Sequence, residues 1–386
     1  MLRALMLGLL LLTGMAAFAA ATVVLNGKTI TVATMEANGK AYVDIVALMK
    51  LLGGKATYDA KTHKVVITTP TAAGPAVKPP TSTGAPGTVQ LAGENGQFGT
   101  VYSIRKDTPL YFILKSAEFT TAQVRVGEQI FVPKAEEKLL VLHFSVQNPQ
   151  KTEQYVRFDS LLFTAVDAMN VNREYVQSWG DAQSRNPVAI SLKPAQKIDA
   201  YTVIAVPAKG TVPKLMVLPG YEGNGPILRY DLRGKIAGLK APIADPADPT
   251  GATALETVSG TVGDAYPYAS FDITVEGFSY STTPLPEDDL EEGERYLFVT
   301  VLMNNKAGID TYTRWDTVDP VVTDADGAEL RYNNMLLATA NRSFSQNLKK
   351  DQEMRLRLCI KVPAGSTPAM LALKEGESRT YEFAIK

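Results

Sequence analysis

The sequence predicts a mainly β protein in which a small α+β N-terminal domain precedes two antiparallel β-sandwiches. Three observations support this prediction. Apolar and polar residues alternate through the C-terminal part of the chain, that part of the sequence repeats once, and two proline-rich segments divide the chain. Alternation with a period of two is the pattern of a strand with one buried face.

The alternation is clearest in two segments. In segment 354–362 every second residue, from Met354 to Val362, is apolar, and segment 139–146 has apolar residues at its even-numbered positions. Turn-forming sequences such as Asp326-Gly327 separate runs of this kind. Several short strands with such separators are typical of an antiparallel sandwich and not of βαβ units.

Two proline-rich segments are expected to be linkers. Residues 70–87 contain five prolines and three glycines without an apolar period, which predicts a semi-extended spacer. Residues 241–254 place three prolines among alanines and aspartates. The expected domains are therefore 22–69, 88–240 and 255–386.

Residues 1–21 have the organisation of a secretory signal peptide. A short basic start, Met1-Leu2-Arg3, precedes an apolar run from Ala4 to Leu12, and small residues permit cleavage after Ala19 or Ala21. The run is too short to cross a bilayer core of ~30 Å, although retention as an uncleaved anchor stays an alternative. We expect an exported protein of the periplasm or cell surface, without a transmembrane segment after cleavage.

The segment 22–69 predicts two strands, a third strand, one helix and two further strands. Asn26-Gly27 between apolar runs is a strong signal for a two-residue hairpin. Asp44 is placed to cap a helix that ends at Gly53-Gly54. The last two strands are expected near 56–58 and 65–68.

The order of short motifs in this segment resembles a known family. Asn-Gly-Lys, Tyr-Val-Asp-Ile-Val-Ala-Leu, Leu-Gly-Gly and Tyr-Asp-Ala-Lys-Thr follow one another as in the copper amine oxidase N-terminal-like domain, a stalk module of bacterial surface proteins. The resemblance implies a mixed fold and a surface role, but no copper. A copper site needs several histidine ligands, whereas this chain has two histidines, His63 and His143, in different predicted domains.

The rest of the chain consists of two copies of one sequence pattern. Residues 137–148 align with 294–305, and at the same offset Tyr155-Val156-Arg157-Phe158-Asp159 meets Tyr312-Thr313-Arg314-Trp315-Asp316. Further on Tyr175 meets Tyr332. Self-similarity at a fixed offset indicates a duplication.

Each copy resembles the bacterial telokin-like extracellular domains, which are immunoglobulin-like sandwiches of uncharacterised function. The resemblance rests on the order of a long strand ending in Asn, an aromatic–Asp strand, an Asp-rich hairpin and a final Val-Pro strand, over most of 98–235 and 256–386. It implies two immunoglobulin-like sandwiches and an extracellular location, but no reaction.

Composition and motifs argue against several function classes. The net charge is −1 and no basic stripe is present, so nucleic-acid binding is not expected. Cys359 is the single cysteine, which rules out an internal disulfide, and no histidine lies near it in sequence. His143 matches Thr300 in the second copy, which is not expected of a required base. We therefore predict no enzyme, no catalytic residues and no cofactor.

Acidic residues supply the best candidates for a metal site, and we reject them. Asp324-Ala325-Asp326-Gly327 looks like half of a calcium loop, but no Glu closes it, and the first copy has Met169 and Asn170 at the corresponding hairpin. A turn explains the residues better. The run 287–294 is expected to be a solvated acidic loop.

Two features are candidate ligand contacts. Arg157-Phe158-Asp159 and Arg314-Trp315-Asp316 either offer an aromatic plane and an ion pair to a sugar, or are buried aromatics flanked by surface ions; their variation in size alone favours packing. Trp179 lies in a polar stretch and has no counterpart in the sequence alignment. If this tryptophan is exposed in a loop, it is the best single candidate for a binding contact.

These inferences together predict a non-catalytic exported protein of the cell envelope or extracellular space. In it a stalk domain presents two immunoglobulin-like domains to an envelope or extracellular protein. The alternative is a surface protein that binds carbohydrate or peptidoglycan, since cell-wall glycan is the other partner that exposed aromatic side chains would suit.

Overall fold

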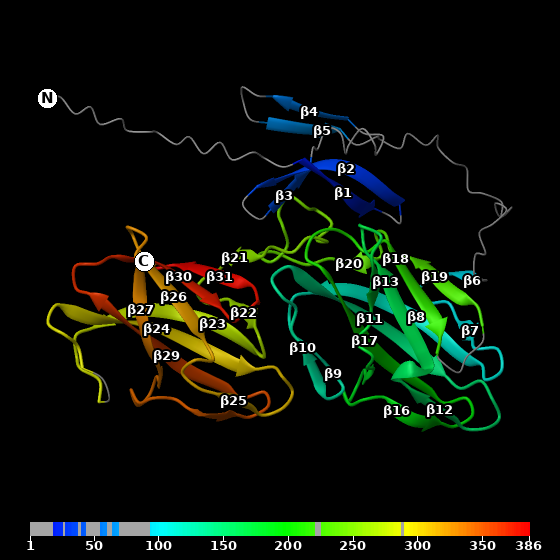
Figure 1. The fold of residues 1–386 in the computed structure, drawn as a ribbon. Helices are drawn as coiled ribbons and strands as arrows, with labels where there is room; N and C mark the ends of the chain where they lie inside the picture. Colours follow the sequence, from blue (N-terminus) through cyan, green and yellow to red (C-terminus); the bar gives the residue numbers. More distant parts are fainter. Residues whose placement is uncertain are drawn as a thin grey trace, which may run out of the picture. The chain divides into compact units, whose positions relative to one another are not determined.

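The structure is a computed structural model that describes residues 93–220, 225–286 and 289–386, together with five strands nearer the N-terminus (Figure 1). The chain divides into two compact units, Met1–Thr88 and Val89–Lys386. The described residues form strands and one short 3₁₀ helix, without an α-helix. The helix expected between Asp44 and Gly53-Gly54, most of the expected signal peptide, the 70–87 linker and His63 lie outside the described residues.

The first unit contains a three-stranded antiparallel sheet and a separate hairpin. The strands are β1 (Phe18–Leu25), β2 (Lys28–Ala37), β3 (Lys40–Val43), β4 (Lys55–Asp59) and β5 (Lys64–Thr68). Leu25 pairs with Lys28, as the Asn26-Gly27 signal predicts, and Asp59 pairs with Lys64. β1 begins at Phe18 and therefore includes residues of the expected cleavage region.

The first sandwich of the second unit has two sheets. One sheet consists of β15 (Gly180–Asp181), β17 (Lys197–Pro207), β11 (Glu137–Gln147), β8 (Leu110–Thr120) and β20 (Ile236–Ala237), with β7 (Tyr102–Ile104) beside β8. The other consists of β14 (Asn172–Glu174), β13 (Leu161–Val166), β18 (Lys214–Pro219), β19 (Ile227–Asp231) and β6 (Gly93–Gly96). Two short antiparallel pairs accompany them: β9 (Val124–Val126) with β10 (Gln129–Phe131), and β12 (Gln154–Arg157) with β16 (Ala189–Leu192).

The alternating residues of these strands meet between the sheets. Phe144 of β11 lies 5.0 Å, between ring centroids, from Phe163 of β13. Both rings belong to one buried apolar core that also includes Leu142 and Leu215. Facing sheets that interdigitate apolar side chains in this way define a β-sandwich.

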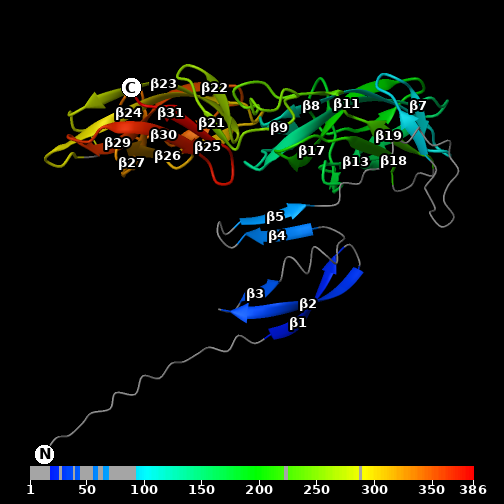
Figure 2. The same cartoon turned by 90° about the horizontal axis from the view of Figure 1, so that it is seen from above.

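The second sandwich has one continuous sheet that folds back on itself. Its order is β21 (Thr257–Ser259), β31 (Thr380–Ala384), β30 (Pro368–Lys374), β26 (Asp319–Asp324), β27 (Glu329–Leu337), β29 (Glu353–Pro363), β24 (Glu294–Asn305), β23 (Phe271–Ser281) and β22 (Ala265–Tyr268). A short pair, β25 (Thr311–Thr313) with β28 (Gln346–Leu348), lies outside it. β27 pairs first with β26 and then with β29. In Figure 2, β23 and β24 lie in one layer and β26 and β30 in the other, and one apolar core lies between.

The two copies share specific hydrogen bonds as well as strands. The buried Asn148 amide donates to the carbonyls of Thr152 (2.7 Å) and Leu192 (2.8 Å). The buried Asn305 amide donates in the same way to Ile309 (2.8 Å) and Leu348 (2.9 Å). The asparagine that ends the long strand in each copy therefore satisfies buried backbone carbonyls of the neighbouring loop.

The segment 241–254, expected as a linker, is held by backbone hydrogen bonds. Leu239 N–H donates to the Gly251 carbonyl and Ala254 N–H to the Ala208 carbonyl, each at 2.9 Å. Lys138 is fully buried and donates to the carbonyls of Pro207 (2.8 Å), Ala208 (2.9 Å) and Gly210 (2.8 Å), and also to that of Ala252. One ammonium group thus connects the end of the first sandwich to the segment that follows it.

A second buried cation connects the two sandwiches directly. Arg379 of the second sandwich is 3% exposed and donates to the carbonyls of Ala135 (3.1 Å) and Glu137 (2.6 Å) in the first, and to that of Leu255 (2.7 Å). Burial lowers the pKa of the Lys138 ammonium to about 8 and also lowers the pKa of the Arg379 guanidinium. We call Lys138, Arg379 and their carbonyl partners the cationic joint.

Candidate functional site

The repeated Arg–aromatic–Asp motif follows a short edge strand in both sandwiches. β12 precedes the 3₁₀ helix η1 (Phe158–Ser160), and β25 precedes a turn that holds Trp315. The Arg157 N–H donates to the Ser160 hydroxyl at 3.0 Å, and the Arg314 N–H donates to the Thr317 hydroxyl at 2.9 Å. A hydroxyl three residues ahead therefore closes the same turn in each copy.

The aromatic side chains of this motif are exposed, so the prediction that they pack in the interior is wrong. Phe158 is 37% exposed and Trp315 is 51% exposed. The hydroxyl of the buried Tyr175 donates to the Phe158 carbonyl (2.9 Å), and the hydroxyl of the partly buried Tyr332 donates to the Trp315 carbonyl (2.6 Å). These bonds hold the backbone of each motif against the core, while the two rings themselves are exposed.

A tyrosine accompanies each exposed ring. Tyr155 is 57% exposed and Tyr312 is 59% exposed. Tyr155 with Phe158 is the first aromatic corner, and Tyr312 with Trp315 is the second. The Tyr312 hydroxyl also hydrogen-bonds to Ser345 Oγ at 2.7 Å.

The charged residues of the motif form an ion pair in each corner. Arg157 Nε lies 2.7 Å from Asp159 Oδ1, and Arg314 Nε lies 2.5 Å from Asp316 Oδ1. Exposed pairs of this kind stabilise a fold by only ~0–1 kcal/mol. Their positions beside an exposed ring suit contact with a partner better than they suit stability.

Trp179 is not a surface contact, contrary to the prediction from its polar neighbours. It is 1% exposed, and its ring packs edge-on against Phe144 (5.0 Å between centroids) and Phe163 (6.0 Å). The stretch is irregular, with a positive φ of 49° at Gln177, so the alternation that marks a strand is lost there. The sequence pattern therefore gives no signal of the burial of Trp179.

The structure also reveals a counterpart for Trp179 that the alignment lacks. Gly180 pairs with Tyr201, and Leu336 pairs with Arg357 at the equivalent register. Val188 N–H donates to the Trp179 carbonyl, and Phe344 N–H donates to the Met335 carbonyl, each at 2.9 Å. Met335 therefore occupies in the second core the place of Trp179 in the first.

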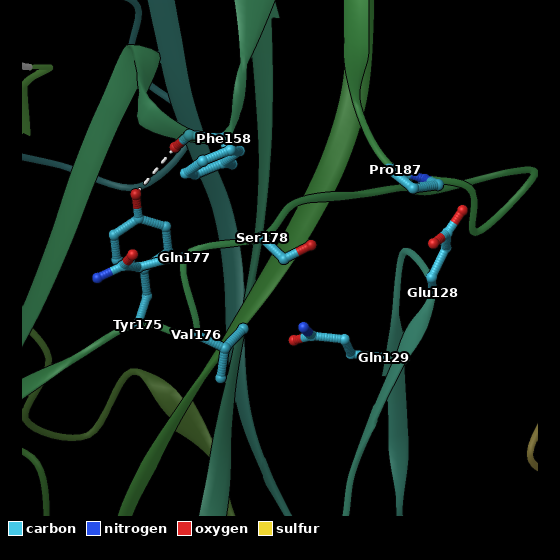
Figure 3. A pocket seen from close by; sticks show the side chains of 8 residues that line it. All are labelled: Glu128, Gln129, Phe158, Tyr175, Val176, Gln177, Ser178 and Pro187. Atoms are coloured by element: carbon cyan, nitrogen blue, oxygen red, sulfur yellow. Dashed lines mark hydrogen bonds between the residues drawn. The ribbon is translucent and has the colours of Figure 1, made fainter.

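A pocket of about 620 Å³ opens beside Phe158 in the first sandwich. We call it the Phe158 pocket. Its walls come from the β9–β10 hairpin, from the irregular stretch after β14, and from Pro187. In Figure 3 the other side chains are arranged around Ser178, whose hydroxyl donates to the Val126 carbonyl at 3.4 Å. The lining residues are Glu128, Gln129, Phe158, Tyr175, Val176, Gln177, Ser178 and Pro187.

The chemistry of this pocket combines one aromatic face with planar polar groups. Glu128 contributes a carboxylate, and Gln129 and Gln177 contribute amides. Neither lysine nor arginine is among the described residues that line it. Such an arrangement suits a neutral molecule with hydroxyl groups, since amides and carboxylates both accept and direct hydrogen bonds. Sequence reasoning identified Phe158 but missed the pocket, because the β9–β10 hairpin that forms one wall is distant in sequence.

The aspartates that were considered for a calcium loop accept backbone hydrogen bonds within hairpin turns. Asp324 Oδ1 accepts from the N–H groups of Asp326 (3.0 Å) and Ala328 (2.9 Å). Asp167 Oδ1 accepts from Met169 and Val171 in the same way, each at 2.9 Å. Burial opposes ionisation of Asp167, but these bonds and the Arg173 guanidinium hold the pKa of its carboxyl below the ordinary value. Both carboxylates are therefore occupied by their own hairpins.

The two other side chains considered for catalysis, Cys359 and His143, are buried or paired. Cys359 is fully buried in an apolar cluster with Leu285 and Tyr296. His143 Nε2 lies 3.0 Å from Glu118 Oε1. In the part of the chain that the structure describes, no group of three or more His, Cys, Asp or Glu side chains is placed to hold a metal ion. The same residues contain no helix long and apolar enough to cross a membrane.

Comparisons with known proteins define no family for this chain. No family model matches it, and no curated protein matches it. The crystal structure of an uncharacterized β-sandwich protein from Clostridium difficile 630 aligns with 38% of this chain and 99% of its own, at 13% identity and a TM-score of 0.28. The resemblances of 22–69 and of the two repeats to named families stay predictions.

Proposed function

We propose that this chain is a non-catalytic exported protein of the cell envelope or extracellular space. In this proposal a stalk domain presents two immunoglobulin-like sandwiches that bind a protein partner through their aromatic corners. The observation that carries the proposal is the exposure of two large aromatic side chains at the equivalent corner of both copies. Tyrosine, tryptophan and arginine are the side chains most enriched at binding hot spots.

The separate parts of the proposal have separate support. Export rests on the signal-like pattern of residues 1–21, and the stalk role rests on the motif order in 22–69. The non-catalytic part is supported by the burial of Cys359, the single thiol, and by the pairing of His143 with Glu118.

Sedimentation with isolated cell envelopes tests the role of the corners. The full-length protein is mixed with envelopes and pelleted, beside a variant that combines Phe158→Ala with Trp315→Ala. We expect the variant to bind at least about tenfold more weakly, because it loses one hot-spot ring from each corner. Met169→Ala is the matched control, since Met169 is 70% exposed and lies outside both corners.

The treatment of the envelopes identifies the class of partner. Digestion of envelope proteins with a protease should abolish sedimentation, whereas digestion of the glycan strands should not. If the double variant and the control pellet as the wild type does, the corners are not the binding surface and the proposal fails.

The Phe158 pocket favours a second candidate function, the binding of carbohydrate. An aromatic face beside amides and a carboxylate is suited to a sugar ring and its hydroxyls. Calorimetric titration of the full-length protein with neutral wall oligosaccharides tests this candidate. Binding that Phe158→Ala or Gln177→Ala weakens, and that Trp315→Ala leaves unchanged, would locate a sugar site in this pocket. Absence of heat with the wild type would count against it.

A further inference from the structure

A second pocket in the same unit gathers positively charged side chains. It has a volume of about 420 Å³ and lies where the end of β8, the β9–β10 hairpin and the turn after β15 meet. Arg125 and Arg185 of the first sandwich and Lys306 of the second line it. We call it the basic pocket.

The charges of the basic pocket are not balanced within it. Among the described residues that line it, Glu118 is the sole carboxylate, against the basic side chains of Arg125, Arg185 and Lys306. Glu118 already contacts His143 Nε2 at 3.0 Å. Like charges that share a partly enclosed space repel one another, and the repulsion grows as water is excluded. An anion that entered the pocket would relieve this repulsion.

Arg125 is held in position for such a ligand. Its Nε donates to the Gly127 carbonyl at 2.7 Å, and its Nη1 donates to the Gly308 carbonyl of the second sandwich at 2.9 Å. The Tyr201 hydroxyl donates to the backbone carbonyl of Arg125. Neutral carbonyls orient a guanidinium without cancelling its charge. Because a guanidinium has five N–H donors, others remain for a carboxylate or phosphate.

Arg185 is placed by a turn whose own carboxylate is occupied. Asp181 Oδ1 accepts from the N–H groups of Ser184 (2.7 Å) and Gln183 (3.1 Å), and Arg185 adopts a positive φ of 61°. A non-glycine residue in the left-handed region is uncommon and persists where the surroundings determine it. Asp181 therefore shapes the loop that carries Arg185 and is not a lining residue of the basic pocket.

We propose that the basic pocket binds a compact anion, a carboxylate or phosphate group on a small molecule, between Arg125, Arg185 and Lys306. This proposal does not depend on the aromatic corners or the Phe158 pocket. Since Lys306 comes from the second sandwich, the bound anion would contact both sandwiches.

Calorimetric titration of the full-length protein at low ionic strength tests the proposal. The probes are glucuronate and inorganic phosphate, with glucose as the uncharged control. We expect at least one anion to bind and glucose not to bind. Binding should weaken as salt rises to about 0.5 M, because the interaction is electrostatic. Tighter binding of glucuronate would indicate a sugar acid, and tighter binding of phosphate would indicate a phosphate ester; either result supports the site.

Charge-removing variants locate the binding. Arg185→Gln and Lys306→Gln should each lower the affinity for the anion about tenfold, because each removes a charge-assisted hydrogen bond. Both side chains are exposed, so we expect the fold to tolerate these changes. Lys151→Gln removes the same charge from an exposed position outside the basic pocket and should leave affinity unchanged. The proposal is overturned if neither anion binds the wild type, or if all three variants bind the anion equally.

Discussion

The two sandwiches share a framework but differ in the connection between their two long central strands. In the first sandwich the β9–β10 hairpin connects β8 to β11 and packs on Val141, Tyr201 and Val203. In the second a loop lies between β23 and β24, and its Leu285 packs on Tyr296 and Cys359. The hairpin supplies Glu128 and Gln129 to the Phe158 pocket and Arg125 to the basic pocket. The Phe158 pocket and the basic pocket thus both depend on the element that the copies do not share.

This difference separates the contributions of duplication and divergence. The shared features, such as Asn148 and Asn305, are buried and satisfy backbone groups. The aromatic corners are also shared, but they are exposed. The β9–β10 residues that line the two pockets lie where the copies differ, whereas Phe158 and Tyr175 of the Phe158 pocket have counterparts in Trp315 and Tyr332. Variants at equivalent positions in the two copies can therefore test which roles are common and which are specific.

Exchange of core residues between the copies should have the largest effect. We expect Trp179→Met to destabilise the first sandwich by about 3 kcal/mol, because it leaves a cavity among Phe144 and Phe163. Adding Val188→Phe should restore at least about 1 kcal/mol, since Met335 and Phe344 fill the equivalent places in the second core. Urea unfolding followed by circular dichroism measures both. A double variant no more stable than the sum of the single effects would contradict the equivalence.

Replacement of the equivalent cations Lys138 and Arg295 should destabilise the two sandwiches to different extents. Lys138→Met should cost about 2–3 kcal/mol, because it leaves several buried carbonyls without a donor. Its counterpart Arg295 donates to the Ser366 carbonyl at 3.0 Å and stacks over the ring of Tyr280. Arg295→Met should therefore cost only about 1 kcal/mol. Equal losses in urea unfolding would show that the cationic joint adds nothing specific to the first copy.

Truncation of the shared asparagine should affect the two copies alike. Asn148→Ala removes an amide that donates to two backbone carbonyls, and Asn305→Ala removes one that donates to three, so we expect a loss of about 2 kcal/mol in either sandwich. Thermal unfolding of the two variants, beside the wild type, measures this. A loss confined to one variant would mean that the duplicated asparagine has diverged in role.

The hairpin aspartates should show the smallest effect, and it should depend on pH. The folded-state pKa of Asp167 is lowered, so its ionised form contributes stability that is full above about pH 4 and is lost as pH falls further. Asp167→Asn should cost about 1 kcal/mol at pH 7 and less near pH 2.5. Asp324 accepts backbone hydrogen bonds but forms no ion pair among the described residues, so Asp324→Asn should cost about 0.5 kcal/mol or less at pH 7. Urea unfolding at the two pH values measures these differences.

Local patterns in the sequence predicted the strands well. The even-numbered apolar residues of 354–362 belong to β29, and Leu356, Leu358 and Ile360 are buried there. The repeated offset likewise predicted that Tyr175 and Tyr332 occupy equivalent places, and both hydroxyls donate to the carbonyl of the corner aromatic. These features succeed because a strand's period and its terminal turn are set by neighbouring residues.

The candidate site was predicted only in part, for a physical reason. Whether Phe158, Trp315 or Trp179 is covered depends on elements distant in the chain, and no local period reports it. Trp179 follows an irregular stretch and turns into the core, while Trp315 follows a regular strand and lies outside. The two pockets depend in the same way on the β9–β10 hairpin and on residues more than one strand away.

The cationic joint has a consequence for how a partner with repeated binding sites would be held. Lys138 and Arg379 donate hydrogen bonds to backbone carbonyls where the two sandwiches meet, so the connection between them is held at several points. If both aromatic corners bind one partner, occupation of the first corner would present the second to that partner at an effective concentration set by this connection and not by diffusion. Two individually weak contacts would then act as one strong contact for a partner whose sites match their spacing, and as separate weak contacts for any other.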